Sequence, residues 1–397
     1  MDLLQSVQTF LGDTGVAQLF AGGDWISGLK TLVMIAIAGV LIYLAIGRGF
    51  EPLLLLPIAV GMLLTNIPGV ELFHSNWYMT EGTIDYLHIL NKGELLDILY
   101  IGVKTGLYPC LIFIGIGAMT DFTPLISNPK SLLIGAGAQL GVFVAFSGAI
   151  FLGFTAQEAS SIGIIGGADG PTAIYVTKTL APALLGAIAI AAYSYMALIP
   201  MIQPPIMKLL TTEKERKIKM TALRPVSKLE KMIFPVMVTV VVGFIVPSAL
   251  SLIGCLMFGN ILNVCGVTDR LSKTAQNGLM NAVTVCLGIS VGATATAERF
   301  LDWPTIKIIV LGLTAFAIST AGGLLTAKVM NKLSGGTINP LIGSAGVSAV
   351  PMAARVAQIE GQKADPSNFL LMHAMGPNVA GVIGSAVAAG VLLACFR

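Results

Sequence analysis

Long apolar stretches separated by short polar ones dominate the sequence. The stretches long enough to cross a bilayer, or to enter it halfway and return, cover residues 31–46, 53–64, 99–119, 131–154, 180–207, 233–258, 275–296, 305–327 and 368–395. Two shorter apolar runs, near 162–176 and 337–354, are too rich in glycine to be continuous spanning helices. The pattern therefore predicts an all-α, polytopic integral membrane protein with two broken or re-entrant helical elements.

The composition agrees with this prediction. Hydrophobic residues make up 55% of the 397 positions and charged residues 11%, whereas a soluble domain has about 25% charged residues. The segment 211–231 is strongly basic, and loops rich in lysine and arginine stay in the cytoplasm. We expect this loop on the cytoplasmic side, either as a topological signal alone or as a docking site for a soluble subunit.

The basic loop separates two halves of the chain that resemble each other. Gly163-Ile-Ile-Gly-Gly-Ala-Asp-Gly-Pro-Thr-Ala-Ile-Tyr-Val176 and Gly343-Ser-Ala-Gly-Val-Ser-Ala-Val-Pro-Met-Ala-Ala-Arg-Val356 both read G-x-x-G-x4-P-x-A-x-x-V. Upstream, Gly115-Ile-Gly-Ala-Met-Thr120 is similar to Val291-Gly-Ala-Thr-Ala-Thr296. An internal duplication explains these matches better than chance identity among 45 glycines.

We therefore expect two inverted structural repeats that form a transporter-like core. Glycine and proline at fixed offsets would break each repeat's helix near the bilayer midplane, where such breaks line ion or substrate sites. Close helix packing through small residues is the competing interpretation, but it does not explain the prolines. The predicted sections are residues 1–98 (N-terminal spans and a polar loop), 99–210 (first repeat, broken at 161–177), 211–231 (basic loop) and 232–397 (second repeat, broken at 337–356).

The first broken segment contains an acid, Asp169, and the sequence has no lysine or arginine between Lys130 and Lys178. A carboxylate at membrane depth costs several kcal/mol unless it is paired, solvated or bound to a metal ion. Such residues usually serve transport or proton transfer. Asp169 is therefore the first candidate for function.

The other polar residues around the two breaks indicate which ion is bound. They are Thr172 in the first repeat, and Asn339, Ser344, Ser348 and the later Asn378 in the second. Carboxylate, amide and hydroxyl oxygens suit a hard cation, and a single carboxylate favours a monovalent one. Na⁺ is the first expectation and H⁺ the second. Arg355 is either a counter-charge or anion ligand, or an arginine that extends to the interface.

Five segments carry a family signal: Gly47-Arg-Gly-Phe-Glu-Pro-Leu-Leu-Leu-Leu-Pro57, Gly117-Ala-Met-Thr-Asp-Phe-Thr-Pro-Leu125, Gly166-Gly-Ala-Asp-Gly-Pro-Thr172, Asn339-Pro-Leu-Ile-Gly-Ser-Ala-Gly-Val-Ser348 and Gly376-Pro-Asn-Val-Ala-Gly-Val-Ile-Gly-Ser-Ala386. Together they resemble the β subunit of the biotin-dependent, sodium-pumping decarboxylases that act on oxaloacetate, methylmalonyl-CoA or glutaconyl-CoA. The resemblance runs from about residue 40 to the C-terminus, and Gly-Gly-Ala-Asp-Gly-Pro-Thr is its most specific signature.

The resemblance implies a multi-pass subunit of the inner (cytoplasmic) membrane that decarboxylates carboxybiotin and couples this reaction to Na⁺ export. It implies catalytic roles for Asp169, Tyr195 and Arg355, with Tyr195 and Arg355 also contacting biotin. It implies that the Na⁺ ligands are Asp169, Asn339, Gly343, Ser348 and Asn378.

The resemblance also implies the partners. They are a carboxyltransferase subunit, a biotin carrier protein and a small single-span membrane subunit, around a homo-oligomeric, trimeric core and without nucleic acid. The chain has no Met-Lys-Met tripeptide of the kind that carries biotin, so carboxybiotin is expected on a partner.

Two alternatives stay open at this point. A freestanding Na⁺-coupled secondary transporter or Na⁺/H⁺ antiporter would contain the same broken repeats, because these repeats encode alternating access and not decarboxylation. A purely structural membrane anchor would leave the buried acid unexplained.

Overall fold

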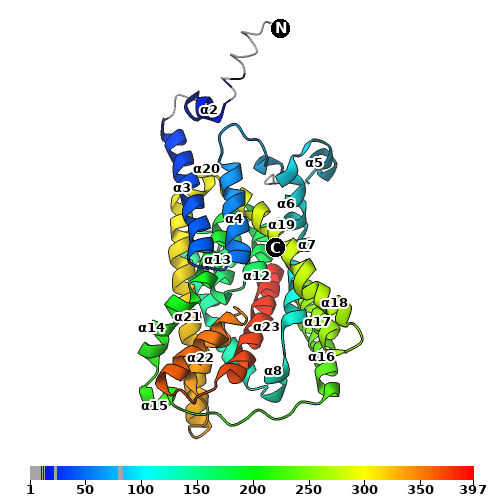
Figure 1. The fold of residues 1–397 in the computed structure, drawn as a ribbon, viewed down its shortest axis with the longest axis vertical. Coiled ribbons are helices and arrows are strands. Elements are labelled where there is room, and N and C mark those ends of the chain that lie inside the picture. The colour runs from blue at the N-terminus through cyan, green and yellow to red at the C-terminus, as the bar shows by residue number, and fades with distance from the viewer. Residues whose placement is uncertain (1–9, 11, 13, 22–24, 79–83) are drawn as a thin grey trace.

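The chain folds into an elongated bundle of helices (Figure 1). The computed structural model describes residues 10, 12, 14–21, 25–78 and 84–397. Every regular element in this described part is helical, as the hydrophobic pattern predicts. Of the predicted N-terminal section 1–98, residues 1–9, 11, 13, 22–24 and 79–83 lie outside the described residues.

Two long apolar helices and a short polar region precede the first predicted repeat. The elements of this part are α2 (Gly15–Ala21), α3 (Trp25–Gly47), α4 (Pro52–Thr65), η1 (Ser75–Trp77) and α5 (Tyr86–Lys92). Helix α3 packs along α4, and both lie at the end of the molecule where the chain begins (Figure 1).

The predicted first repeat contains two bent helix pairs and the first broken segment. Its elements are α6 (Leu95–Thr105), α7 (Leu107–Met119), α8 (Thr123–Ser127), α9 (Ser131–Ala138), α10 (Leu140–Phe151), α11 (Ala156–Gly163), η2 (Ile164–Gly167), α12 (Gly170–Leu180), η3 (Pro182–Leu184), α13 (Leu185–Ala197) and α14 (Ile199–Leu210). Within the predicted broken segment 161–177, η2 and a non-helical turn separate α11 from α12.

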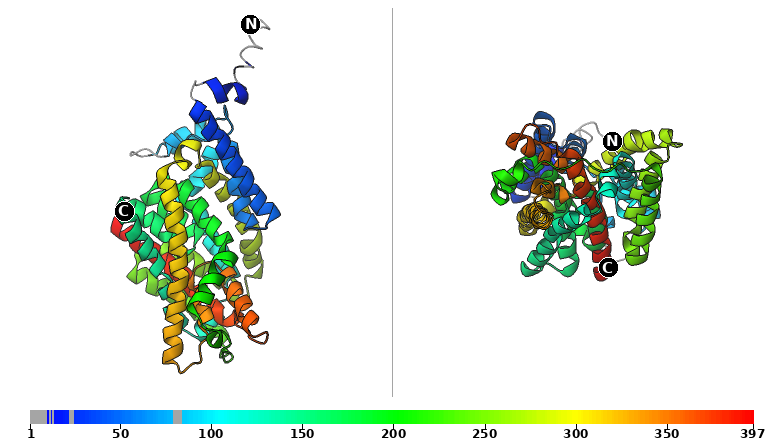
Figure 2. Two further views of the ribbon diagram at one scale, coloured as in Figure 1. Left: turned by 90° about the vertical axis from the view of Figure 1, so that its left-hand side faces the viewer. Right: turned by 90° about the horizontal axis from the view of Figure 1, so that it is seen from below.

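The basic loop and the predicted second repeat complete the chain. Their elements are α15 (Glu213–Arg216), α16 (Lys228–Ile245), η4 (Pro247–Ala249), α17 (Leu250–Val264), α18 (Asp269–Thr274), η5 (Ala275–Leu279), α19 (Met280–Ala293), α20 (Ala297–Phe300), α21 (Trp303–Leu333), η6 (Pro340–Gly346), α22 (Met352–Ala364) and α23 (Leu371–Phe396). Within the predicted broken segment 337–356, η6 and an extended segment separate α21 from α22. Figure 2 shows α21 running along most of the bundle.

Five helices of the described residues are long and apolar enough to cross a membrane, and seven spans result if each bent pair counts as one. The pairs are α6–α7, bent by 66°, and α13–α14, bent by 63°. The apolar run 233–258 is not one span, because Pro247 separates α16 from α17 and the two helices pack against each other. A proline lacks the amide hydrogen that would continue the helix and disfavours helical backbone at the residue before it.

Glycines bring the central helices into backbone contact at two related places. A Cβ added at Gly117 of α7 or Gly259 of α17 would lie 1.8 Å or 2.0 Å from a carbonyl oxygen of the facing helix. The same holds between α4 and α19, where a Cβ at Gly61 or Gly292 would lie 2.1 Å or 2.0 Å from such an oxygen. Gly117 and Gly292 are matched positions of the sequence duplication, so this packing is compatible with two structural repeats.

Candidate functional site

The first broken element places Asp169 at the start of a helix. Ala168 has a left-handed backbone, with φ of 55°, which turns the chain out of η2. Asp169 is then the N-cap of α12, and its Oδ1 accepts a hydrogen bond of 3.2 Å from the backbone N of Thr172. The N-terminal end of a helix dipole favours negative charge, so the turn both terminates one helix and stabilises the carboxylate.

The second broken element is held in place by glycines and by one amide. A Cβ at Gly343 in η6 would lie 2.3 Å from the carbonyl oxygen of Gly323 in α21, and the reverse distance is 2.1 Å. The carbonyl groups freed by the break are not left unpaired. The Nδ2 atom of Asn378 in α23 donates to Ala345 O at 2.9 Å and to Val347 O at 2.7 Å.

The two broken elements touch each other. The backbone N of Ser348 donates to Gly167 O at 3.0 Å, which joins the second break to the first. A chain of side chains runs across the same junction: Ser385 Oγ donates to Asp169 Oδ2 at 2.8 Å and lies 2.9 Å from Ser348 Oγ. Asp169 and Ser348, which are far apart in sequence, therefore belong to one polar network at the meeting point of η2, η6 and α23.

Burial makes this network unusual. Asp169 is 5% exposed, and Ser385 and Asn378 are fully buried. Asp169 takes part in none of the ion pairs formed by the described residues. Among the described residues, Thr172, Ser385 Oγ and the end of α12 stabilise its negative charge without any cationic side chain, so a cation at the site would be strongly favoured.

The donor set also fits a monovalent cation. Thr172 Oγ1 and Asn378 Oδ1 are buried, and neither has a hydrogen bond of normal geometry to a described residue. Buried polar atoms are normally paired, so these two unpaired oxygens, on the helix that Asp169 caps and on the amide that holds the second break, are candidate ligand positions. No group of three or more His, Cys, Asp or Glu side chains that could hold a metal ion occurs in the part of the chain that the structure describes.

The structure does not bring every predicted site residue to this junction. Asn339 caps η6 through a bond from Leu341 N, and its Nδ2 donates to Arg216 O at 2.9 Å and Ile218 O at 2.8 Å, so it joins η6 to the basic loop. Gly343 serves the close contact with α21. Ser344 Oγ bonds within η6, to Leu341 O.

Among the described residues, no hydrogen bond or ion pair joins Tyr195 or Arg355 to each other or to Asp169. The Tyr195 hydroxyl donates to the carbonyl of Ile309 in α21, and its ring packs against Gly312. Arg355 is exposed on α22, and no hydrogen bond or ion pair links its side chain to a described residue. Both side chains are nevertheless on elements that pack against the broken segments.

Sequence reasoning missed Ser385, the residue that links the two breaks. The signal was present: Asn378, Gly381 and Ser385 follow at i, i+3 and i+7 and therefore share one face of α23. Ser348 Oγ contacts the carbonyl oxygen of Gly381 at 2.8 Å on the same face.

Comparisons with known proteins agree on one family. A family model described as the Na⁺-transporting oxaloacetate decarboxylase beta subunit matches residues 30–396. The methylmalonyl-CoA decarboxylase subunit beta of Propionigenium modestum is 58% identical over 402 residues, covering 99% of this chain and 100% of the relative.

Two further relatives carry different substrate names. The glutaconyl-CoA decarboxylase subunit beta of Acidaminococcus fermentans is 58% identical over 362 residues (91% of this chain, 92% of the relative), and the oxaloacetate decarboxylase beta chain of Klebsiella pneumoniae is 48% identical over 435 residues (98% and 99%). The chain belongs to the family of the beta subunits of Na⁺-transporting decarboxylases.

Proposed function

We propose that Asp169, Ser348 and Ser385, with Thr172 and Asn378, bind the Na⁺ ion that this subunit exports. Membership of the family makes the chain a membrane-embedded subunit that couples decarboxylation to sodium transport. One observation carries the assignment of the site: a buried carboxylate that forms no ion pair with any described residue lies where the two broken helices meet. The predicted ligands Asn339 and Gly343 remain part of this proposal, although in this structure the Asn339 amide donates to the basic loop and Gly343 packs against Gly323 of α21.

The chemistry that drives transport is the decarboxylation of carboxybiotin. The family is biotin-dependent, and we propose that the biotin arrives on a carrier protein of the same complex after a carboxyltransferase subunit has loaded it. Loss of CO₂ from the biotin nitrogen consumes one proton. Asp169 would supply a path for that proton. When Na⁺ binds to the Asp169 carboxyl group, it displaces the proton from that group into the buried network.

Tyr195 and Arg355 are proposed to act where carboxybiotin enters. The exposed, unpaired guanidinium of Arg355 suits a carboxylate, which arginine binds through two parallel hydrogen bonds. The Tyr195 hydroxyl, which bonds the backbone of α21, would position that helix against η2 and η6. Relative motion of the broken elements and the surrounding helices would open the ion site to one side of the membrane at a time.

The organisation into two inverted repeats, 99–210 and 232–397, and the trimeric core with a small single-span subunit are parts of the same proposal. The matched glycine contacts at Gly117 and Gly292 support the repeats. The relatives are named as subunits of decarboxylases, which favours the pump over a freestanding carrier.

Replacement of Asp169 tests the proposed site directly. The variant Asp169→Asn keeps the size and the N-cap acceptor but removes the charge. In proteoliposomes that contain the assembled complex, we expect it to abolish Na⁺ uptake and the Na⁺ dependence of CO₂ release. The matched control is Ser344→Ala, which removes another buried hydroxyl of the break region and should keep both activities. Normal Na⁺ dependence in Asp169→Asn would remove this carboxylate from the mechanism.

A further inference from the structure

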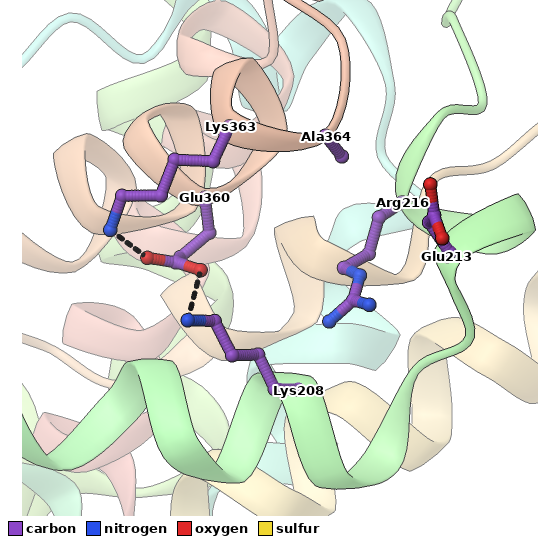
Figure 3. Close-up of a pocket in the computed structure, with 6 residues that line it drawn as sticks. All are labelled: Lys208, Glu213, Arg216, Glu360, Lys363 and Ala364. Atoms are coloured by element: carbon purple, nitrogen blue, oxygen red, sulfur yellow. Dashed lines mark hydrogen bonds and ion pairs between the residues drawn. The ribbon is translucent and has the colours of Figure 1, made fainter.

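A charged cavity lies beside the basic loop, away from the ion site. It has a volume of about 380 Å³ and lies between α14, α15 and α22. The side chains that line it, shown in Figure 3, are Lys208, Glu213, Arg216, Glu360, Lys363 and Ala364. All but one of these side chains are charged.

The ion pairs inside the cavity leave a positive charge available. The side chain of Glu360 is only 2% exposed, and its carboxylate lies 2.5 Å from Lys363 Nζ and 3.9 Å from Lys208 Nζ. Glu213 is paired with Lys217 at 2.5 Å. The guanidinium of Arg216 extends into the cavity and makes no hydrogen bond or ion pair with a described residue (Figure 3).

Hydrogen bonds hold the backbone of Arg216, the last residue of the short helix α15 within the basic loop. Its carbonyl oxygen accepts hydrogen bonds from Asn339 Nδ2 at 2.9 Å and from Asn368 Nδ2 at 3.0 Å. The same two amides hold Ile218 O, and Lys219 pairs with Asp365 at 3.2 Å. These contacts hold the backbone from which the guanidinium extends, so the loop does not have to become ordered when a ligand binds, which lowers the entropic cost of binding.

We propose that this cavity docks an acidic side chain of the soluble partner that delivers carboxybiotin. A carboxylate is the group that a free guanidinium binds best, through two parallel hydrogen bonds, with Lys208 as a second cation. The cavity is at the low end of the size range for ligand sites, which suits one side chain. This inference rests on the proposed function, because that function requires a soluble partner on the cytoplasmic side.

The lining argues against a lipid headgroup as the occupant. A bound lipid needs apolar surface next to the basic residues for its acyl chains. The residues that line the cavity are all charged except Ala364, and none of them is a large hydrophobic residue. Its position beside the loop 211–231, which the positive-inside rule places in the cytoplasm, is the position that a soluble subunit reaches.

The contacts of Asn339 also connect the docking cavity with the ion site. Its Nδ2 holds Arg216 O, while its Oδ1 accepts from Leu341 N at the start of η6. Two residues beyond the end of η6 lies Ser348, which contacts Ser385. A partner that engages Arg216 therefore binds directly beside the element that carries part of the ion site.

The test measures binding of the purified biotinylated carrier subunit of the complex to the detergent-solubilised chain. Arg216→Gln should weaken this binding about tenfold or more, because it removes a charged, bidentate donor. The control Lys214→Gln removes an exposed charge from the same short helix without touching the cavity and should change the Kd by less than about twofold. The unfolding temperature and its increase with Na⁺ should stay at the wild-type values in both variants, which separates this proposal from that of the ion site.

Three outcomes would overturn the docking proposal. One is an unchanged Kd in Arg216→Gln. Another is an equal loss in Lys214→Gln, which would mean that diffuse charge and not the cavity attracts the partner. The third is that Arg216→Gln loses binding to vesicles of phosphatidylglycerol but not to vesicles of phosphatidylcholine, while its Kd for the carrier subunit stays at the wild-type value. That result would make the cavity a lipid site.

Discussion

Removing the Ser385 hydroxyl is the sharpest test of the junction between the two broken helices. Ser385→Ala deletes the donor that lies 2.8 Å from Asp169 Oδ2 and the link of 2.9 Å to Ser348 Oγ. Because the serine is fully buried, water is not expected to replace the lost hydroxyl. The carboxylate then keeps only the backbone bond from Thr172, at 3.2 Å.

The magnitude follows from the type of bond. Without Na⁺, Asp169 is proposed to carry a proton, and the hydrogen bond from Ser385 favours the ionised form that Na⁺ binds. A hydrogen bond to a charged group contributes about 1.5–3 kcal/mol, and each 1.4 kcal/mol is a factor of ten, so Na⁺ binding in competition with the proton should weaken by roughly 10- to 150-fold. If Ser385 Oγ is itself a ligand of the ion, the loss lies at the upper end. Turnover at saturating Na⁺ should fall much less, because Asp169 remains in place.

The assay is a Na⁺ titration of CO₂ release by the assembled complex, together with the Na⁺-induced increase in unfolding temperature of the isolated chain. Ligand binding to the folded state alone stabilises it by about 2.7 kcal/mol at a hundred times Kd. Both titrations should move to higher Na⁺ by the same factor in Ser385→Ala and stay unchanged in Ser344→Ala. A folded Ser385→Ala protein whose half-saturating Na⁺ concentration lies within twofold of wild type would refute the proposed network.

Three further predictions concern the framework of the site. Gly343→Ala places a Cβ 2.3 Å from the carbonyl oxygen of Gly323, so thermal unfolding should show a loss of about 1–3 kcal/mol or more, whereas Gly254→Ala, with open space around the added Cβ, should not destabilise. Asn378→Asp removes the donor to Ala345 O and Val347 O, so the same assay should show a loss of about 1–3 kcal/mol, and stability equal to wild type would contradict the role given to this amide. Hydrogen bonds from Ser367 and the nearby Lys219 lower the pKa of Asp365 from 3.8 to about 2. Its contribution to holding the loop should therefore be present above about pH 4 and lost as the pH falls toward 2, and hydrogen exchange of residues 216–220, corrected for intrinsic rates, should show this loss in wild type and not in Asp365→Asn.

The sequence alone determined the class of protein and the position of its two breaks. Apolar runs that are long enough to span a bilayer and contain few charges are not stable when exposed to water. The sequence therefore predicts a membrane protein before any tertiary contact is known. Gly166, Gly170 and Pro171 interrupt the first segment because of local backbone chemistry, and Pro340 begins the short turn of the second. The cost of burying Asp169 is likewise a property of the residue and its neighbours in the chain.

Only the tertiary structure decided which polar groups meet. Asp169 and Ser385 lie 216 positions apart, and their contact depends on how α23 crosses the end of η2. The same packing turns the Asn339 amide toward the basic loop and the Asn378 amide onto the carbonyls of the second break. Whether two such groups form a hydrogen bond depends on the relative position of their helices to within about an ångström. Backbone–backbone contacts at glycine residues set that position, and no local sequence pattern encodes it.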